Sequence, residues 1–273
     1  MDIEGYIPGR KVLILGSGDV GLIMARRFAM EGAEVVGVVE VMPYPGGLDR
    51  NLQCLRDFNI PLYLRHAATF IHGSERVEAV TISRLDEHGK PIPGEEKIIE
   101  CDTLILSVGL IPENELSKSA GIILDLKTGG PIVDENMETS VEGIFACGNV
   151  VHVHDLVDHV TQDGEIAGKN AAKKVLGELR PLKRKIHLRA EGNIRYVVPQ
   201  IISGERPLTL YSRVKAPAFN AKIRVGRNIV IHKRVVKPPE LVTIKLTAQR
   251  LKKLEKWERE LTVNMTEGVQ DEN

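Results

Sequence analysis

The stretch Lys11–Gly21, KVLILGSGDVG, decides the fold of the first hundred residues. It starts as a short apolar run, which is typical of a buried parallel strand, and continues as a Gly-x-Gly-x-x-Gly turn. Apolar residues then recur at helical spacing from Asp19 to Glu31, and a second apolar run follows at Glu34–Glu40. Together these signals predict a strand–helix–strand unit, and therefore an α/β fold with parallel strands.

The glycine-rich turn has the pattern and the context of a dinucleotide-binding loop, since it follows a strand and opens a helix. Its first glycine permits a tight turn, its second lets the backbone approach a pyrophosphate, and its third lets helix and strand pack closely. The helix N-terminus offers unpaired N–H groups to the phosphates. The predicted cofactor-binding residues of this loop are Gly16, Ser17, Gly18, Asp19, Val20 and Gly21.

Glu40 ends the second strand, nineteen positions past Gly21. An acidic residue in this place can accept hydrogen bonds from ribose hydroxyls, and its charge repels a 2′-phosphate. The sequence therefore predicts NAD(H) as cofactor in preference to NADP(H). The alternative is a glycine-rich turn that binds nothing, which the strand–loop–helix–acid context disfavours.

The 273 residues carry 37 basic and 37 acidic side chains, but these are unevenly distributed. Residues 1–182 have 17 basic and 28 acidic side chains, a net charge of −11, and residues 183–273 have 20 and 9, a net charge of +11. Opposite charge in the two regions indicates two modules with different neighbours. With zero net charge and 4% aromatic residues, the composition does not favour a nucleic-acid partner.

Three widely spaced cysteines, Cys54, Cys101 and Cys147, fit neither a disulfide framework nor a zinc ribbon. The N-terminal residues lack the pattern of a signal peptide, and no apolar run approaches the roughly 18 residues of a membrane helix. These features predict a cytoplasmic protein without a membrane span.

Further along the chain, short strands are predicted within residues 60–64 and 76–105, and a helix over 157–176. After residue 182 the runs become β-branched and alternating, which predicts a small β-rich domain, followed by a charged helix at Gln249–Leu261. The predicted domains are 9–110, 111–180 and 183–262, with a flexible tail at 263–273.

Two later segments carry a family resemblance. Cys101–Asn114 (CDTLILSVGLIPEN) is predicted as a strand ending in a Gly-x-x-Pro turn, and Thr139–Asn149 (TSVEGIFACGN) as a strand ending in Gly-Asn. With the first loop, they make the chain resemble the pyridine nucleotide-disulfide oxidoreductase superfamily of flavoproteins. The phrases GIFACGNVVHVHDLVDHV and IRYVVPQ are similar to the branch of NAD/FAD-dependent dehydrogenases found beside anaerobic glycerol-3-phosphate dehydrogenases and in amino-acid and opine dehydrogenase complexes.

This resemblance implies a Rossmann-like NAD domain at 9–110, part of an FAD domain at 111–180, and NAD(H) and FAD as cofactors. It further implies cofactor-binding roles for Gly109, Gly148, Asn149, Asp158 and His159, the last two near the flavin ring.

Three departures from the family pattern matter. The N-terminal half of the FAD domain, with its own glycine loop, is missing, Asn149 stands where most members have Asp, and there is no Cys-x-x-Cys pair for dithiol chemistry.

The segment His152–His159, HVHDLVDH, is dense in potential metal ligands. His154 and Asp158 are four residues apart, which suits a metal site if the segment is helical. The alternative, an acidic helix N-terminus, is the more common arrangement, and we predict no metal site from the sequence alone.

We predict an NAD(H)-dependent flavoprotein oxidoreductase, or a subunit of one, that passes hydride between nicotinamide and FAD. Its predicted partner is a second dehydrogenase or electron-transfer subunit, or the missing FAD half, with the basic C-terminal region as a docking surface. The sequence assigns no catalytic side chain, because the cofactors carry such chemistry. The alternative is a non-catalytic NAD-binding accessory or sensing subunit.

Overall fold

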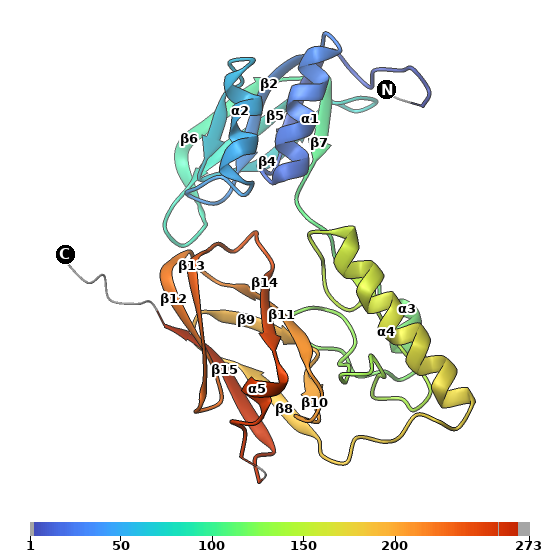
Figure 1. The fold of residues 1–273 in the computed structure, drawn as a ribbon. Coiled ribbons are helices and arrows are strands. Elements are labelled where there is room, and N and C mark those ends of the chain that lie inside the picture. The colour runs from blue at the N-terminus through green and yellow to red at the C-terminus, as the bar shows by residue number, and fades with distance from the viewer. Residues whose placement is uncertain (1–2, 256, 267–273) are drawn as a thin grey trace, which may run out of the picture. The chain divides into compact units, whose positions relative to one another are not determined.

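A computed structural model describes residues 3–255 and 257–266 and divides the chain into two compact units, one within Met1–Gly109 and one within Leu110–Asn273 (Figure 1). They are called the N-terminal and the C-terminal unit below.

The N-terminal unit contains a parallel sheet, an antiparallel sheet and helices. In chain order its elements are β1 (Lys11–Leu15), α1 (Asp19–Met30), β2 (Glu34–Glu40), the 3-10 turn η1 (Asp49–Leu52), α2 (Gln53–Arg56), β3 (Leu62–Leu64), β4 (His66–His72), β5 (Ala79–Leu85), β6 (Pro91–Glu100) and β7 (Thr103–Leu106). The parallel sheet has the order β3-β2-β1-β7, and the antiparallel sheet the order β4-β5-β6. The predicted strand–helix–strand start is confirmed.

Strand β1 shows why these layers stack. Its side chains alternate, so Val12 and Ile14 pack with Leu22 and Phe28 of α1, whereas Leu13 packs with Val80 and other residues of the antiparallel sheet. Both faces of the parallel sheet are therefore covered, which accounts for its continuous apolar runs. The carboxyl ends of β1, β2 and β7 meet at one edge of the sheet, next to the glycine-rich turn.

The C-terminal unit begins with a segment of few regular elements and continues as a β-rich region. Its elements are α3 (Glu115–Ser119), the 3-10 turn η2 (Gly148–Val150), α4 (Val157–Val175), β8 (Ile186–Ala190), β9 (Ile194–Val198), β10 (Ile201–Ile202), β11 (Leu208–Val214), β12 (Ala218–Val225), β13 (Ile229–Val236), β14 (Val242–Leu246), α5 (Ala248–Leu251) and β15 (Glu260–Thr266).

Two sheets form the β-rich region, in the orders β10-β8-β15-β12-β13 and β14-β11-β9. Alternate residues of both enclose one apolar core that includes Ile194, Leu210, Ile223 and Ile244. A second, smaller cluster joins residues of the preceding segment, among them Val133 and Val151, to Tyr196 of β9. The 111–180 segment and the β-rich region therefore share buried side chains.

Several sequence predictions are wrong in detail. Strand β4 lies outside the predicted strand ranges, and β6 is one continuous strand from Pro91 to Glu100 within the range predicted to hold short strands. Thr139–Asn149 forms no strand and has a single antiparallel bridge, Glu138 to Phe145. A strand needs a partner edge, and this bridge is too short to provide one.

The predicted helix Gln249–Leu261 is also wrong, because the helical turn ends at Leu251 and β15 begins at Glu260. Residues 263–266, predicted as tail, belong to this strand, with Val263 fully buried. Pairing on both sides, with β8 and β12, outweighs the local helical pattern. The rest of the predicted tail, 267–273, lies outside the described residues.

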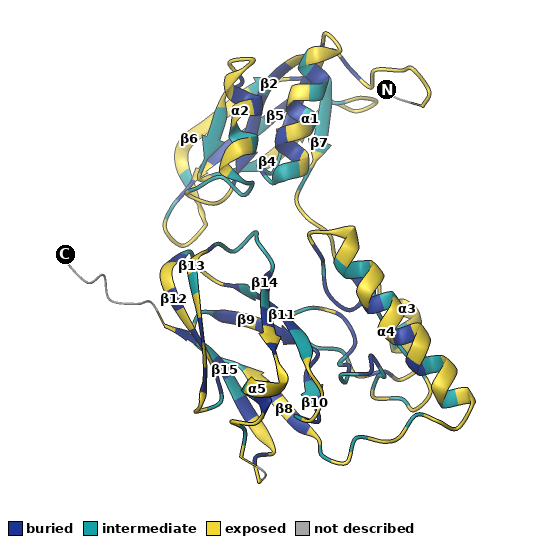
Figure 2. Cartoon of the chain, viewed as in Figure 1, coloured by how far each residue is buried: buried dark blue, intermediate teal, exposed yellow. Residues whose placement is uncertain are grey.

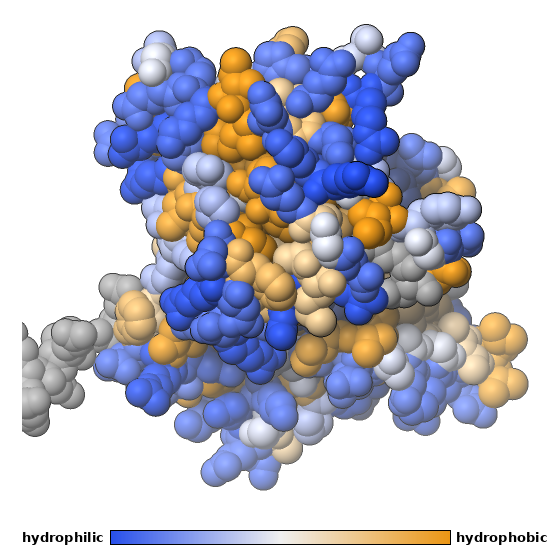
Figure 3. All heavy atoms as spheres, turned by 90° about the horizontal axis from the view of Figure 1, so that it is seen from above, coloured by the Kyte–Doolittle hydropathy of each residue, from blue (hydrophilic) through white to orange (hydrophobic). Residues whose placement is uncertain are grey.

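Buried residues run along the sheets of both units (dark blue in Figure 2). Apolar side chains also reach the surface, and in Figure 3 they gather as orange patches among hydrophilic residues. Leu116, Leu126, Val157 and Val175 of the C-terminal unit are each at least 75% exposed. Within the described residues, no helix combines the length and apolar character needed to cross a membrane.

Candidate functional site

The glycine-rich turn joins β1 to α1, and each of its glycines meets a different constraint. Gly16 has φ +95°, and a Cβ there would lie 2.1 Å from the carbonyl oxygen of Ser107. A Cβ on Gly21 would lie 2.3 Å from the carbonyl oxygen of Gly16. A Cβ on Gly18 would meet nothing within 4 Å. The first and third glycines are therefore required by packing, and the second leaves space open outside the chain.

Helix α1 begins directly after this open position. Its N-cap residue is Gly18, which has no side chain to accept from the first backbone N–H groups. Twelve residues of helix direct the positive end of their dipole toward the same space. The turn thus offers N–H donors and positive potential to an anion, as the sequence predicted for the phosphates of a dinucleotide.

Glu40 is 7% exposed and is fixed at the end of β2 by three hydrogen bonds. Its Oε2 accepts from the backbone N–H of Ser17 at 3.0 Å and from the Ser17 hydroxyl at 2.6 Å, and its Oε1 accepts from the backbone N–H of Met42 at 2.9 Å. The carboxylate therefore binds the glycine turn to the sheet. Each oxygen has two lone pairs, so Oε1 keeps accepting capacity for another donor.

The segment after β2 folds back onto the glycine turn. The backbone N–H of Gly46 donates to the Ser17 hydroxyl oxygen at 2.7 Å, and that of Leu48 donates to Asp19 Oδ1 at 2.8 Å. The side-chain amide of Asn51 also donates to Asp19 Oδ1, at 2.6 Å. Asp19, predicted as a cofactor ligand, is therefore an anchor for residues 46–51. This contact was not predicted from the sequence, where residues 42–51 have only the composition of a turn.

A cavity of about 360 Å³ opens at the carboxyl edge of the parallel sheet. Its lining comes from the ends of β1, β2 and β7, the glycine turn and the start of β4: Leu15, Gly16, Gly18, Val39, Glu40, Val41, His66, Ala67, Ala68, Ser107 and Val108. Of the predicted loop residues, Gly16, Gly18 and Glu40 line this cavity. Val20 is 69% exposed and Gly21 packs beneath the turn, so neither lines it.

Of the predicted flavin-side residues, Gly109 lies in the N-terminal unit, and Gly148, Asn149, Asp158 and His159 lie in η2 and the first turn of α4. Gly109 ends the N-terminal unit with φ +89°, and Gly148, with φ +69°, begins η2. Asn149 is exposed, and its Oδ1 accepts from the backbone N–H of His154 at 3.0 Å, so it stabilises the turn that precedes α4. Asp158 lies exposed in the first turn of α4.

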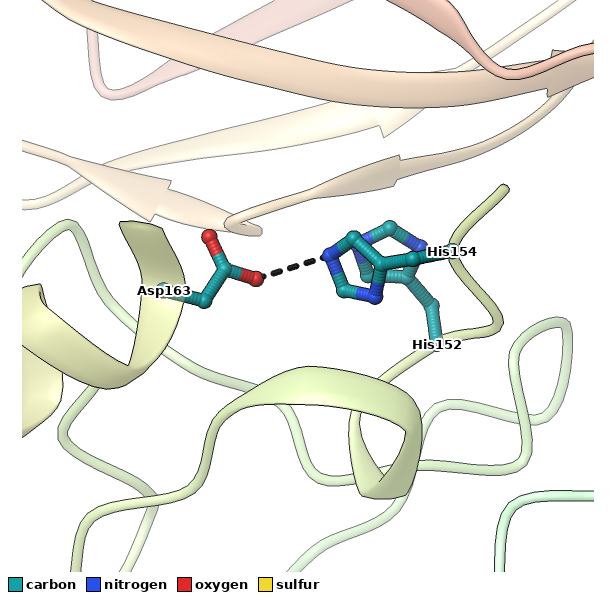
Figure 4. Close-up of side chains that lie close together, drawn as sticks. All are labelled: His152, His154 and Asp163. Atoms are coloured by element: carbon teal, nitrogen blue, oxygen red, sulfur yellow. Dashed lines mark hydrogen bonds and ion pairs between the residues drawn. The ribbon is translucent and has the colours of Figure 1, made fainter. Parts of the chain in front are cut away.

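A buried polar cluster, which the sequence did not predict in this form, lies beside α4 in the C-terminal unit (Figure 4). It consists of His152, His154 and Asp163, each at least 91% buried. His154 Nε2 lies 2.9 Å from Asp163 Oδ2 in a hydrogen bond, and the two imidazole rings are 4.0 Å apart. Both ring nitrogens of His152 and Nδ1 of His154 are buried without a hydrogen-bond partner.

Aromatic side chains from the β-rich region surround this cluster. Tyr211 of β11 lies 5.5 Å from each of the His152 and His154 rings and 5.4 Å from His159, between ring centres. Burial raises the pKa of Tyr211 to about 12, and the Asp163 charge adds to this shift. Burial, helped by the charge of His154, lowers the pKa of His152 to about 3, so this imidazole is neutral and its lone pair is available.

A second cavity, of about 400 Å³, adjoins this cluster. Asp163 and Tyr211 belong to its wall, together with α4 residues such as Lys169 and Lys173 and with Arg206 from the loop before β11. The cluster is therefore enclosed by protein on most sides and borders open volume on one.

The three cysteines are free thiols in the structure. Burial raises the pKa of Cys147, and the nearby Asp163 carboxylate raises it further, so its thiol stays protonated. Burial also raises the pKa of Cys101. A protonated thiol is a poor nucleophile.

The chain is similar to known proteins over most of its length. The chain is 25% identical over 250 residues to "Nitric oxide reductase FlRd-NAD(+) reductase" from Shigella flexneri, which covers 89% of the chain and 60% of that relative. It is 31% identical over 182 residues to "NADH oxidase" from Methanocaldococcus jannaschii, covering 60% of the chain and 37% of the relative. The chain thus spans about 60% or less of the length of these relatives.

Solved structures agree with the fold. The thioredoxin reductase of T. acidophilum superposes with a TM-score of 0.53 and 29% identity, over 61% of this chain and 53% of that one. The family model described as pyridine nucleotide-disulphide oxidoreductase matches residues 3–164, which is more than half of the sequence. The chain therefore belongs to the pyridine nucleotide-disulphide oxidoreductase family.

Proposed function

We propose that the N-terminal unit binds NAD(H) and that the chain is part of an NAD(H)-dependent flavoprotein oxidoreductase. The observation that carries this proposal is the open space at Gly18, which faces an uncapped helix N-terminus and lies beside a cavity lined by Glu40. Open volume, N–H donors and a fixed carboxylate meet at one sheet edge, as the pyrophosphate and ribose of a dinucleotide require.

The residues of the N-terminal unit fit such a cofactor in distinct ways. The N–H groups after Gly18 would hold the phosphates, because no side chain of the N-cap residue competes for them. Glu40 Oε1 would accept a ribose hydroxyl, since its single hydrogen bond comes from Met42. Ser17 and Asp19 hold the turn and the 46–51 segment in place, so little ordering is needed when the cofactor binds.

The C-terminal unit fits one side of an FAD. The Gly148–Asn149 turn and the N-terminus of α4, which has no side-chain cap, would face the flavin, with Asp158 and His159 nearby. The sequence contains one glycine loop of the required pattern, so the adenosine part of FAD needs residues from elsewhere. When bound, nicotinamide and flavin supply the hydride and electron transfer, and the protein supplies position and exclusion of water.

The test is a titration of the purified chain with NADH and FAD. We expect NADH to bind, and a flavin-loaded sample to turn yellow and to be bleached by NADH without oxygen. A colourless chain that binds NADH without turnover would support the accessory or sensing alternative. A chain that binds neither NADH nor NAD+ would contradict the proposal.

Replacing Glu40 with Gln is expected to reduce the preference for NADH over NADPH. The Gln side chain keeps the size and one oxygen but loses the charge that repels a 2′-phosphate. The dissociation constant for NADPH divided by that for NADH should therefore fall about tenfold. Glu34→Gln, on the exposed opposite end of β2, is the matched control. An unchanged ratio in the Glu40 variant would show that this carboxylate serves only to hold the glycine turn.

We further propose that an electron-transfer subunit or a further FAD-domain segment covers part of the C-terminal unit. The exposed apolar residues of the 111–180 segment support a further polypeptide neighbour. The outward faces of β12 and β13 carry Lys222, Arg224 and Arg234, all exposed, which favours an acidic partner.

Charge reversal tests the basic face. The double variant Lys222→Glu, Arg224→Glu should slow reduction of a small acidic electron-transfer protein severalfold at low salt, because steering of the partner is lost. The difference should shrink at high salt, where charges beyond about 3 Å are screened at 1 M. Lys90→Glu, exposed on the N-terminal unit, is the control. If the parent chain, the double variant and Lys90→Glu react at equal rates at low salt, the partner does not dock on the basic face of β12 and β13.

A further inference from the structure

The buried cluster of His152, His154 and Asp163 is not explained by the proposed nucleotide sites. His152 is 1% exposed, yet neither of its ring nitrogens has a hydrogen-bond partner. Buried polar atoms are nearly always paired, and an unpaired one destabilises the fold. Nδ1 of His154 is likewise buried without a hydrogen-bond partner. Unpaired imidazole nitrogens buried beside a carboxylate indicate a group that would bind to them.

The donor atoms are close enough to share an ion. One nitrogen from each histidine and one oxygen of Asp163 all lie within 4.8 Å of one another. A metal with bonds of about 2.0–2.2 Å would draw them together through small side-chain rotations. Figure 4 shows the carboxylate and the stacked imidazoles converging on one region, with Asp163 extending from α4 and the histidines from the preceding turn.

The chemistry of the donors limits the choice of ion. Two imidazoles and one carboxylate suit Zn²⁺ and neighbouring first-row metals better than Mg²⁺ or Ca²⁺, which take mainly oxygen ligands. The positive charge of Arg213 nearby is balanced by Asp155, with which it forms an ion pair. The cavity walled by Asp163 and Tyr211 offers an entry path and room for a water as fourth ligand.

We propose that His152, His154 and Asp163 bind one divalent transition-metal ion of the Zn²⁺ class beside helix α4. The sequence spacing suggested His154 and Asp158 as a pair of metal ligands. This pair does not form, because the Asp158 side chain is exposed in the first turn of α4. Asp163, further along α4, takes its place. This site is independent of the NAD(H) loop, which lies in the other unit.

The experiment uses the untagged full chain, stripped with a chelator and titrated with ZnCl₂ and CoCl₂. We expect one equivalent to bind, the thermal midpoint to rise, and Co²⁺ to give the visible absorption of a four-coordinate site without a thiolate charge-transfer band. Binding at several equivalents, or none, or a thiolate band from Co²⁺, would overturn the proposal.

Three variants separate a metal site from adventitious binding. Asp163→Asn preserves size and can still accept from His154, but it should weaken Zn²⁺ binding more than about 100-fold because a ligand is lost. His152→Leu should abolish binding. His232→Ala removes an exposed imidazole from β13 of the same unit and should bind as the parent chain does. Equal affinity in all four proteins would overturn the proposal.

The stability of the metal-free variants gives a second readout. Without metal, His152→Leu should be at least as stable as the parent, because it replaces a buried imidazole that has no partners with an apolar group. With saturating Zn²⁺ the parent chain should be the more stable of the two. If His152→Leu is less stable than the parent chain in the presence of chelator, the imidazole has a structural partner in the protein and the metal assignment is wrong.

Discussion

Gly16→Ala is expected to destabilise the N-terminal unit by about 2–5 kcal/mol and to abolish NADH binding. An alanine at φ +95° costs about 1–2 kcal/mol, and a Cβ only 2.1 Å from the Ser107 carbonyl oxygen adds an overpacking cost of about 1–3 kcal/mol. The clash involves backbone on both sides, so no side chain can rotate away. Denaturant unfolding and an NADH titration measure the two effects.

Gly18→Ala is the matched comparison in the same loop. Its Cβ would meet nothing within 4 Å, so stability should change by less than about 0.5 kcal/mol. NADH affinity should nevertheless fall, because the methyl group would occupy the space proposed for the pyrophosphate. Gly164→Ala in α4, also without a neighbour within 4 Å, should stabilise by up to about 1 kcal/mol and leave NADH affinity unchanged. Tight NADH binding by Gly18→Ala would place the cofactor elsewhere.

Glu135→Ala is expected to destabilise the C-terminal unit by about 3–5 kcal/mol. The Glu135 side chain is 3% exposed, and its carboxylate joins the 111–180 segment to the β-rich region. It accepts from the backbone N–H of Ser203 at 2.6 Å and the Ser203 hydroxyl at 2.8 Å, and it pairs with Arg206 at 2.7 Å. Truncation leaves the Ser203 N–H buried and unpaired, and the arginine without its partner.

A double-mutant cycle with Arg206→Ala isolates the ion pair from the serine contacts. We expect a coupling energy above about 1 kcal/mol, because one partner is buried. Arg189→Ala is the control, since its pair with Glu260 at 3.7 Å is more than half exposed on both sides and should contribute at most about 1 kcal/mol. Equal costs for the Glu135–Arg206 and Arg189–Glu260 pairs would show that burial of Glu135 does not strengthen its interaction.

The elements that were predicted well are those whose signal is local. Lys11–Leu15, Glu34–Glu40 and the helix from Val157 carry an uninterrupted periodic pattern, and the glycine turn has a fixed sequence. Strand β15 was missed because its stability comes from pairing with β8 and β12, which lie far away in sequence. Propensity alone could not reveal that contact.

In the candidate sites, too, the residues with a local sequence signal could be predicted and those positioned by distant contacts could not. Gly16, Gly18 and Glu40 could be found from their spacing, and all three line one cavity. The anchoring role of Asp19 could not, because it depends on how residues 46–51 fold back. Tyr211 and Asp163 had no sequence signal either. Leu210, Tyr211 and Ser212 are buried in succession, since β11 packs against the apolar core on one face and the histidine cluster on the other.

The central position of β15 has a consequence for how the chain is made. This strand, Glu260–Thr266, lies between β8 and β12 in the five-stranded sheet, and its pairing with β8 is parallel and spans more than 70 residues. A growing polypeptide can complete the N-terminal unit early, but the sheet stays open until Thr266 has been synthesised. During that interval the edges of β8 and β12 are exposed to other strands. Nascent chains should therefore depend most on chaperones late in translation.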